Sequence, residues 1–141
     1  MTPVEKMLAE SECTRLCNDF IYHIDRRQYE PFLALFAPDP TLDRAGQVFK
    51  GMDGLKQFCE GRALDRYVRP ATSNIRIDMT GPATARGSSS VMMFGAKAEP
   101  DAALPLPSSL LIFAEYEDDY VLTGAGWKIK NRKITIVFAP S

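Results

Sequence analysis

The apolar residues of this chain change their spacing near its midpoint, and this change limits the fold more than any other feature. In the second half, residues 73–80 alternate, with Ile75, Ile77 and Met79 on one side, which is the period of a half-buried strand. In the first half, apolar residues recur at the spacing of three and four that marks one helix face; they are Cys13, Leu16, Cys17, Phe20, Ile21 and Ile24. Helices followed by long antiparallel strands predict the α+β class.

The first half is expected to hold three helices. The first extends from about Pro3 to Arg27, with Thr2 as its N-cap. The second is short and is ended by Pro38 and Pro40, because proline cannot continue a helix; it carries Phe32, Leu33, Leu35 and Phe36. Two short extended pieces, residues 41–44 and 47–50, lead to a third helix, which begins at Gly51 and carries Leu55, Phe58, Cys59 and Arg62.

The second half is expected to form strands over residues 73–80, 83–97, 108–122 and 127–138. Residues 99–107 contain three prolines and predict a surface loop, with a pocket mouth as one place for it to lie. A long, strongly twisted sheet covered by helices on one face is expected to curl around the first helix. The resulting cone, formed by residues 1–141 as one domain, would enclose a small apolar pocket of the kind that binds ligands.

Composition narrows the range of partners. The chain is 45% hydrophobic and 25% charged, and its net charge of -1 predicts neither a nucleic-acid nor a membrane partner. Charged residues throughout the first twenty positions indicate no signal peptide. Cys13, Cys17 and Cys59 are therefore expected to be reduced, buried thiols of a cytoplasmic protein, and one histidine is too few for a zinc site. Because the sequence also lacks a glycine-rich phosphate loop, no cofactor is predicted.

Short segments spread over nearly the whole chain carry a family resemblance. They are residues 20–27 (FIYHIDRR), 35–39 (LFAPD), 51–55 (GMDGL), 73–75 (SNI), 116–120 (YEDDY), 126–129 (GWKI) and Arg132. These segments resemble the SnoaL-like domains of the nuclear transport factor 2 superfamily, the cystatin-like α+β cone. That superfamily includes scytalone dehydratase, bile acid dehydratases, steroid isomerases and the small β subunits of aromatic-ring dioxygenases. The resemblance implies the cone fold but no single activity, since this fold supports many functions.

The resemblance makes Asp25 the first catalytic candidate. In the dehydratase branch, an aspartate at this place faces the cavity and moves protons, and burial would raise its pKa toward a useful range. The alternative is that Asp25 only binds an arginine or a backbone amide. The histidine of the dehydratases is replaced by Pro70, which leaves His23 as the histidine for any proton transfer. On the first helix, Asp25 lies on one edge of the apolar stripe and His23 on the other edge, so the helical pattern does not favour either residue. The alternative for His23 is a partly exposed helix residue with no role in proton transfer.

Other polar and aromatic residues are further candidates for the site. Asp43 lies near the position of the steroid isomerase base, where Arg44 fits equally well, or it is an ordinary polar residue of a short strand. Candidate substrate-binding residues are Tyr22, Tyr67, Asn74 and Tyr116 as hydrogen-bond donors, and Phe94, beside Met92 and Met93, as apolar lining. We interpret Trp127 and Arg132 as packing residues.

Two functions follow from these expectations. The first is a cofactor-independent lyase or isomerase, dehydratase-like, that acts on a small cyclic or aromatic apolar compound in the pocket. The second is a non-catalytic ligand-binding or oligomerisation module, such as a partner resembling a dioxygenase β subunit. In both cases the open face of the sheet is expected to form a homodimer or homotrimer.

Overall fold

The computed structural model describes residues 1–107 and 109–141, and these form three helices and six strands. The helices are α1 (Pro3–Asp25), α2 (Tyr29–Leu33) and α3 (Gly51–Glu60). The strands are β1 (Phe36–Arg44), β2 (Gln47–Lys50), β3 (Arg66–Gly81), β4 (Thr84–Lys97), β5 (Ser109–Thr123) and β6 (Gly126–Phe138). Within the described residues, no helix has the length and apolar character needed to cross a membrane.

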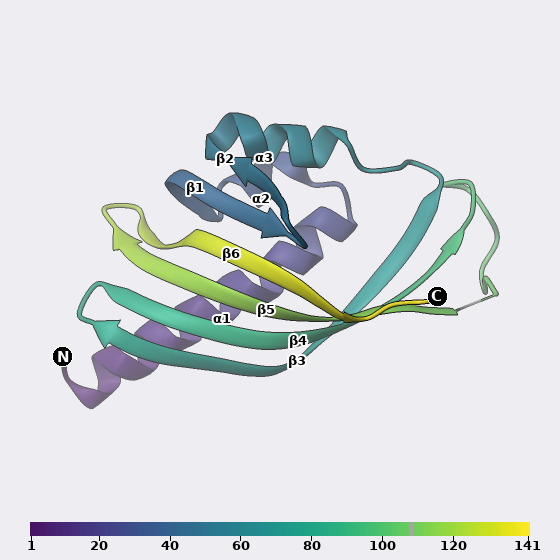
Figure 1. The fold of residues 1–141 in the computed structure, drawn as a ribbon. Helices are drawn as coiled ribbons and strands as arrows, with labels where there is room; N and C mark the ends of the chain where they lie inside the picture. The colour runs from purple at the N-terminus through teal and green to yellow at the C-terminus, as the bar shows by residue number, and fades with distance from the viewer. Residues whose placement is uncertain (108) are drawn as a thin grey trace.

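The strands form one sheet in the order β2-β1-β6-β5-β4-β3. All neighbours pair antiparallel except β1 and β6, which are parallel. Figure 1 shows the sheet strongly curved, with α1 crossing its concave side and α3 above the short β1–β2 hairpin. The predicted α+β fold, with a curved, mostly antiparallel sheet backed by helices, is confirmed.

Helix α1 begins where the sequence predicts it to begin. The Thr2 hydroxyl accepts from the Glu5 amide, and the Glu5 carboxylate accepts from the Thr2 amide, so the two residues form a capping box. The helix ends slightly earlier than predicted, because Arg26 caps it and Arg27 has a positive φ of 58°. Asp25 is therefore the last helical residue, at the point where the chain turns away.

The second helix differs from the prediction. It covers only Tyr29–Leu33, and Phe36 already belongs to β1, so Pro38 and Pro40 lie within a strand and do not end a helix. The pairing of β1 with β6 is irregular between Phe36 and Thr41, which accommodates residues that have no N–H to donate. The strand predicted from residue 73 also begins earlier, at Arg66.

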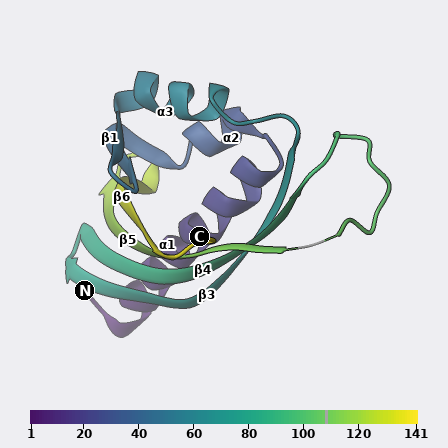
Figure 2. The same cartoon turned by 45° about the vertical axis from the view of Figure 1, so that its right-hand side comes forward.

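The core lies between α1 and the concave face of the sheet. The apolar stripe of α1 packs there, and Cys13, Cys17 and Cys59 are buried and free, as expected. Burial raises the pKa of the Cys13 thiol to about 12 and that of Cys59 to about 11. The loop of residues 99–107 contains no strand, also as expected, and Figure 2 shows it projecting away from the helices.

Candidate functional site

A pocket of about 400 Å³ opens between the end of α1, helix α3 and the concave face of the sheet. Its volume is in the range of small-molecule sites. Both halves of the sequence contribute, because the curved sheet brings β3 to β6 opposite the helices. The residues that line it are Phe20, Ile21, Ile24, Asp25, Arg44, Gln47, Phe49, Gln57, Phe58, Gly61, Arg62, Ala63, Arg66, Val68, Pro70, Met93, Ile112, Tyr116, Ile134 and Ile136.

Asp25 is the one acidic residue among the described residues that line this pocket. Its side chain is only 5% exposed, and it also borders a smaller hollow of about 190 Å³. Arg69 Nη1 lies 3.1 Å from one carboxylate oxygen of Asp25 and 3.0 Å from the other, and Arg69 Nη2 donates to the Tyr67 hydroxyl. The Arg69 side chain is 50% exposed. Asp25 therefore lies at the boundary between the pocket and an arginine at the surface.

Burial is the largest influence on the Asp25 carboxyl. It raises the pKa above the ordinary value, and the positive charges of Arg69, Arg26 and Arg62 lower it without cancelling the effect of burial. A carboxylate whose pKa is raised is a stronger base than an exposed one. Asp25 therefore combines a raised pKa with a position in the pocket wall.

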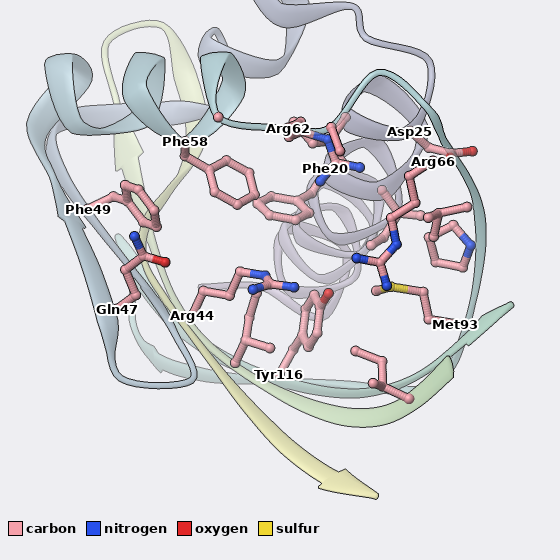
Figure 3. A pocket seen from close by; sticks show the side chains of 18 of the residues that line it. Phe20, Asp25, Arg44, Gln47, Phe49, Phe58, Arg62, Arg66, Met93 and Tyr116 are labelled. Carbon is pink, nitrogen blue, oxygen red and sulfur yellow. The ribbon is translucent and has the colours of Figure 1, made fainter. Parts of the chain in front are cut away.

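Arginine side chains dominate the polar part of the pocket. Figure 3 shows the guanidinium groups of Arg44 and Arg66 reaching into it from opposite sides, with Arg62 on a third side. Much of the apolar wall consists of aromatic rings, those of Phe20, Phe49, Phe58 and Tyr116. The pocket thus combines flat apolar surfaces with several cationic groups.

A buried ion pair supports this wall from behind. Arg132 Nε donates to Asp118 Oδ1 at 2.7 Å and Arg132 Nη2 to Asp118 Oδ2 at 2.8 Å, and the Tyr120 hydroxyl also donates to Asp118. The guanidinium carbon of Arg132 lies 4.3 Å from the centre of the Phe20 ring and 4.7 Å from that of Tyr116. The ion pair therefore fixes two rings that line the pocket.

The structure brings some of the predicted site residues to the pocket and leaves others away from it. Asp25 and Tyr116 line the pocket, and Tyr67 borders the smaller hollow beside Asp25. His23 is not among the lining residues; its Nδ1 lies 2.8 Å from the side-chain oxygen of Gln28. Asp43 lies near the end of β1, where its carboxylate accepts from the Gly46 amide of the following turn.

The other predicted binding residues lie outside the pocket. Tyr22 is exposed and packs under the guanidinium of Arg26. Asn74 has a positive φ of 54° in β3, and Phe94 is exposed on β4. The loop of residues 99–107 does not line the pocket either, although Pro100 borders the smaller hollow.

Local patterns in the sequence are weak signals for the arginines of the pocket. Arg62 falls on the apolar stripe predicted for the third helix, where a charged residue is unexpected, although it lies just beyond the end of α3. Arg44 is marked only as an alternative to Asp43, and no pattern marks Arg66. Among residues 1–107 and 109–141, no three histidine, cysteine, aspartate or glutamate side chains meet as a metal ion would require.

Solved structures of low sequence identity share this fold. A candidate scytalone dehydratase from Novosphingobium aromaticivorans DSM 12444 has a TM-score of 0.83 at 23% identity, with 99% of this chain and 91% of that chain covered. A hexachlorocyclohexane dehydrochlorinase, LinA-type3, from Novosphingobium barchaimii LL02 has a TM-score of 0.84 at 17% identity, covering 99% and 93%. An NTF2-like protein with a cystatin-like fold, also from Novosphingobium aromaticivorans, has a TM-score of 0.80 at 15% identity, covering 98% and 88%.

The family assignment comes from the sequence itself. No curated protein matches the chain. The family model of the SnoaL-like domain, in contrast, matches residues 5–133. That match includes the end of α1, helix α3 and all of the pocket's arginines. The chain belongs to the SnoaL-like domain family.

Proposed function

We propose that this protein is a lyase or isomerase that moves a proton on a small cyclic or aromatic compound held in the pocket, with Asp25 as the proton acceptor. One observation carries the proposal: a carboxylate that is almost fully buried, with a raised pKa, borders a cavity walled by aromatic rings. The similar structures named as a dehydrochlorinase and a candidate dehydratase support a lyase-type role.

The proposed reaction requires a base to remove a proton and positive charge to stabilise the anion that forms. The Asp25 carboxylate takes a proton from a carbon beside a carbonyl, and the electrons of the C–H bond move into an enolate. An isomerase returns the proton to a different carbon, whereas a lyase expels a leaving group with its electron pair. The guanidinium groups around the pocket stabilise the negative charge that develops in either case. Proton transfer by Asp25 needs no cofactor.

A non-catalytic binding role is the second candidate, and two observations favour it. Asp25 is ion-paired with Arg69, so its carboxylate already has a partner. Pro70, which cannot exchange a proton, lines the pocket at about the place where the related dehydratases have a histidine. In this second role the pocket would hold a ligand without converting it, and the domain would act as a module of a larger assembly.

Proton–deuterium exchange separates the two candidates without knowledge of the natural substrate. The probes are 2-tetralone, a neutral ketone, and 4-oxocyclohexanecarboxylate, an anionic one, and exchange beside each carbonyl is followed by NMR in D₂O. We expect the wild type to accelerate exchange of at least one probe and Asp25→Asn to lose about 10²–10⁴-fold of that acceleration.

Asp19→Asn is the matched control, because Asp19 lies on α1 in an ion pair with Arg15 and outside the pocket. Equal exchange by wild type and Asp25→Asn would remove Asp25 as the base, and binding without exchange would favour the second candidate.

A further inference from the structure

The cationic groups of the pocket come from three separate parts of the chain. Arg44 is the last residue of β1, Arg62 follows α3, and Arg66 is the first residue of β3. Their side chains all border the same cavity, and Figure 3 shows them around one space beside the ring of Tyr116. Their convergence depends on the tertiary fold and is not a property of one basic segment.

None of these arginines has an ion-pair partner within residues 1–107 and 109–141. Arg44 and Arg66 take part in no ion pair or side-chain hydrogen bond there, and Arg62 Nε is buried without a hydrogen-bond partner. Other arginines of the chain do have such partners, since Arg69 pairs with Asp25 and Arg132 with Asp118. Arg132 Nη1 also lacks a hydrogen-bond partner, although the rest of that guanidinium is paired with Asp118. Among the described residues, the arginines with no ion pair and no side-chain hydrogen bond at all are therefore those of the pocket, where a ligand could reach them.

The side chains of the pocket carry an excess of positive charge. Burial lowers the pKa of the Arg62 guanidinium, and the positive charges of Arg27 and Arg44 lower it further, against opposing effects of Tyr29 and Asp25. The negative charge of Asp25 is matched by Arg69, whose side chain lies outside the pocket lining. Three cations thus remain for the one cavity among the described lining residues. Guanidinium groups bind carboxylates with paired, charge-assisted hydrogen bonds, so an anion would satisfy them.

We infer that the pocket selects an organic carboxylate carried on a ring, with Arg44, Arg62 and Arg66 around the carboxylate and the aromatic wall against the ring. Phe49 and Phe58 offer the flat apolar surface that the ring needs. The volume of about 400 Å³ suits a compound of one or two rings. That this carboxylate is a substrate rests on the proposed function, but its binding does not.

Binding of benzoate and 1-naphthoate, measured by isothermal titration calorimetry, tests the inference, with benzamide as the neutral counterpart of benzoate. Neither acid has a proton beside a ketone, so binding is read without turnover. We expect the wild type to bind at least one acid, and benzamide to bind at least tenfold more weakly than benzoate. Arg44→Gln and Arg66→Gln should each weaken binding of the acids about tenfold or more. Arg76→Gln, which removes an exposed arginine of β3 outside the pocket, should leave binding unchanged.

Several results would overturn the inference. They are equal binding of benzoate and benzamide, no binding of either acid, or arginine variants that bind like Arg76→Gln. Because Arg62 is partly buried, the test depends on Arg44 and Arg66, which are exposed, and each variant's melting temperature is measured to confirm folding. Asp25→Asn separates this inference from the proposed function. If that variant and the wild type bind benzoate equally but neither exchanges the ketone probes, the carboxylate site stands and the catalytic role fails.

Discussion

Two opposing effects act on the carboxyl group of Asp25, and their balance sets its pKa. Burial disfavours the charged form, whereas Arg69, Arg26 and Arg62 favour it. The Arg69 side chain is half exposed, and solvent weakens an ion pair of this kind. Burial prevails, so the native state holds the Asp25 proton more firmly than the unfolded chain does.

This balance predicts that Asp25→Asn is more stable than the wild type at neutral pH. A raised pKa in the folded state contributes stability that is present below the unfolded pKa, about 3.9, and is lost as pH rises through the folded pKa. The asparagine of the variant does not titrate. The variant's free energy of unfolding should therefore rise above that of the wild type between the unfolded and the folded pKa of Asp25, and the difference should persist at higher pH. Urea unfolding of both proteins at several pH values from about 3 to 7 measures it.

A less stable variant would contradict this prediction. If Asp25→Asn is less stable than the wild type at pH 7, the ion pair with Arg69 outweighs the cost of burial, and Asp25 stabilises the fold. Asp19→Asn again serves as the control, since it alters a more exposed ion pair of the same helix.

The position of Asp25 could be predicted from the sequence, but its surroundings could not. The resemblance in residues 20–27 places it beside a cavity, whereas the helical pattern alone favours His23 equally. The fold separates the two, since α1 ends at Asp25 and His23 meets Gln28 outside the pocket. Arg69 contacts Asp25 and Arg66 lines the pocket only because the tertiary fold brings β3 to the end of α1. A local sequence pattern does not predict such contacts between distant residues.

At the scale of elements, local patterns predict the first and third helices and most of each long strand, although β3 begins at Arg66 and not at residue 73. The main error comes at Phe36, where a short apolar run with two following prolines resembles the end of a helix. The segment instead pairs with β6, from the opposite end of the chain, and the Lys130 ammonium donates to the carbonyls of Pro38 and Asp39. A strand held by a partner so distant in sequence has no signal in its own residues.

The contact between α3 and β2 sets one side of the pocket, and Gly54 makes it close. A Cβ atom added at Gly54 would lie 2.9 Å from the backbone carbonyl carbon of Phe49, a contact that the backbone cannot relieve without moving. Phe49 and Phe58 both line the pocket and lie ring to ring across this contact, with centroids 5.3 Å apart. A shift of α3 would therefore reach the site.

Gly54→Ala is thus expected to lower the free energy of unfolding by about 1–3 kcal/mol and to weaken binding of ring ligands in the pocket. Denaturant unfolding and titration of benzoate measure the two effects. Gly124→Ala is the control, because a Cβ at Gly124 meets no atom within 4 Å. A Gly54→Ala protein with unchanged stability and binding would show that α3 can move away from β2 without cost.

The whole molecule has two unlike faces. The helices cover the concave face of the sheet, and Figures 1 and 2 show the convex face free of them. Met93 and Ile112 line the pocket, so the alternate residues Met92 and Phe113 lie on the convex side. Phe138 pairs with Phe113, with ring centroids 6.1 Å apart. An apolar row of Met92, Phe113 and Phe138 therefore crosses three neighbouring strands on the uncovered face.

We expect this row to hold two or three copies of the chain together. Met92 is 38% exposed and Phe138 69% exposed, and apolar side chains gathered on an uncovered sheet face mark interaction sites. In analytical ultracentrifugation the wild type should sediment as a dimer or trimer, and Phe138→Asp should sediment near the 15.7 kDa of one chain. Val48→Asp is the matched control, since Val48 is an exposed apolar residue of β2 outside the row. A wild type that stays monomeric at the highest concentration tested would exclude self-association, and an oligomer that survives Phe138→Asp would place the interface elsewhere.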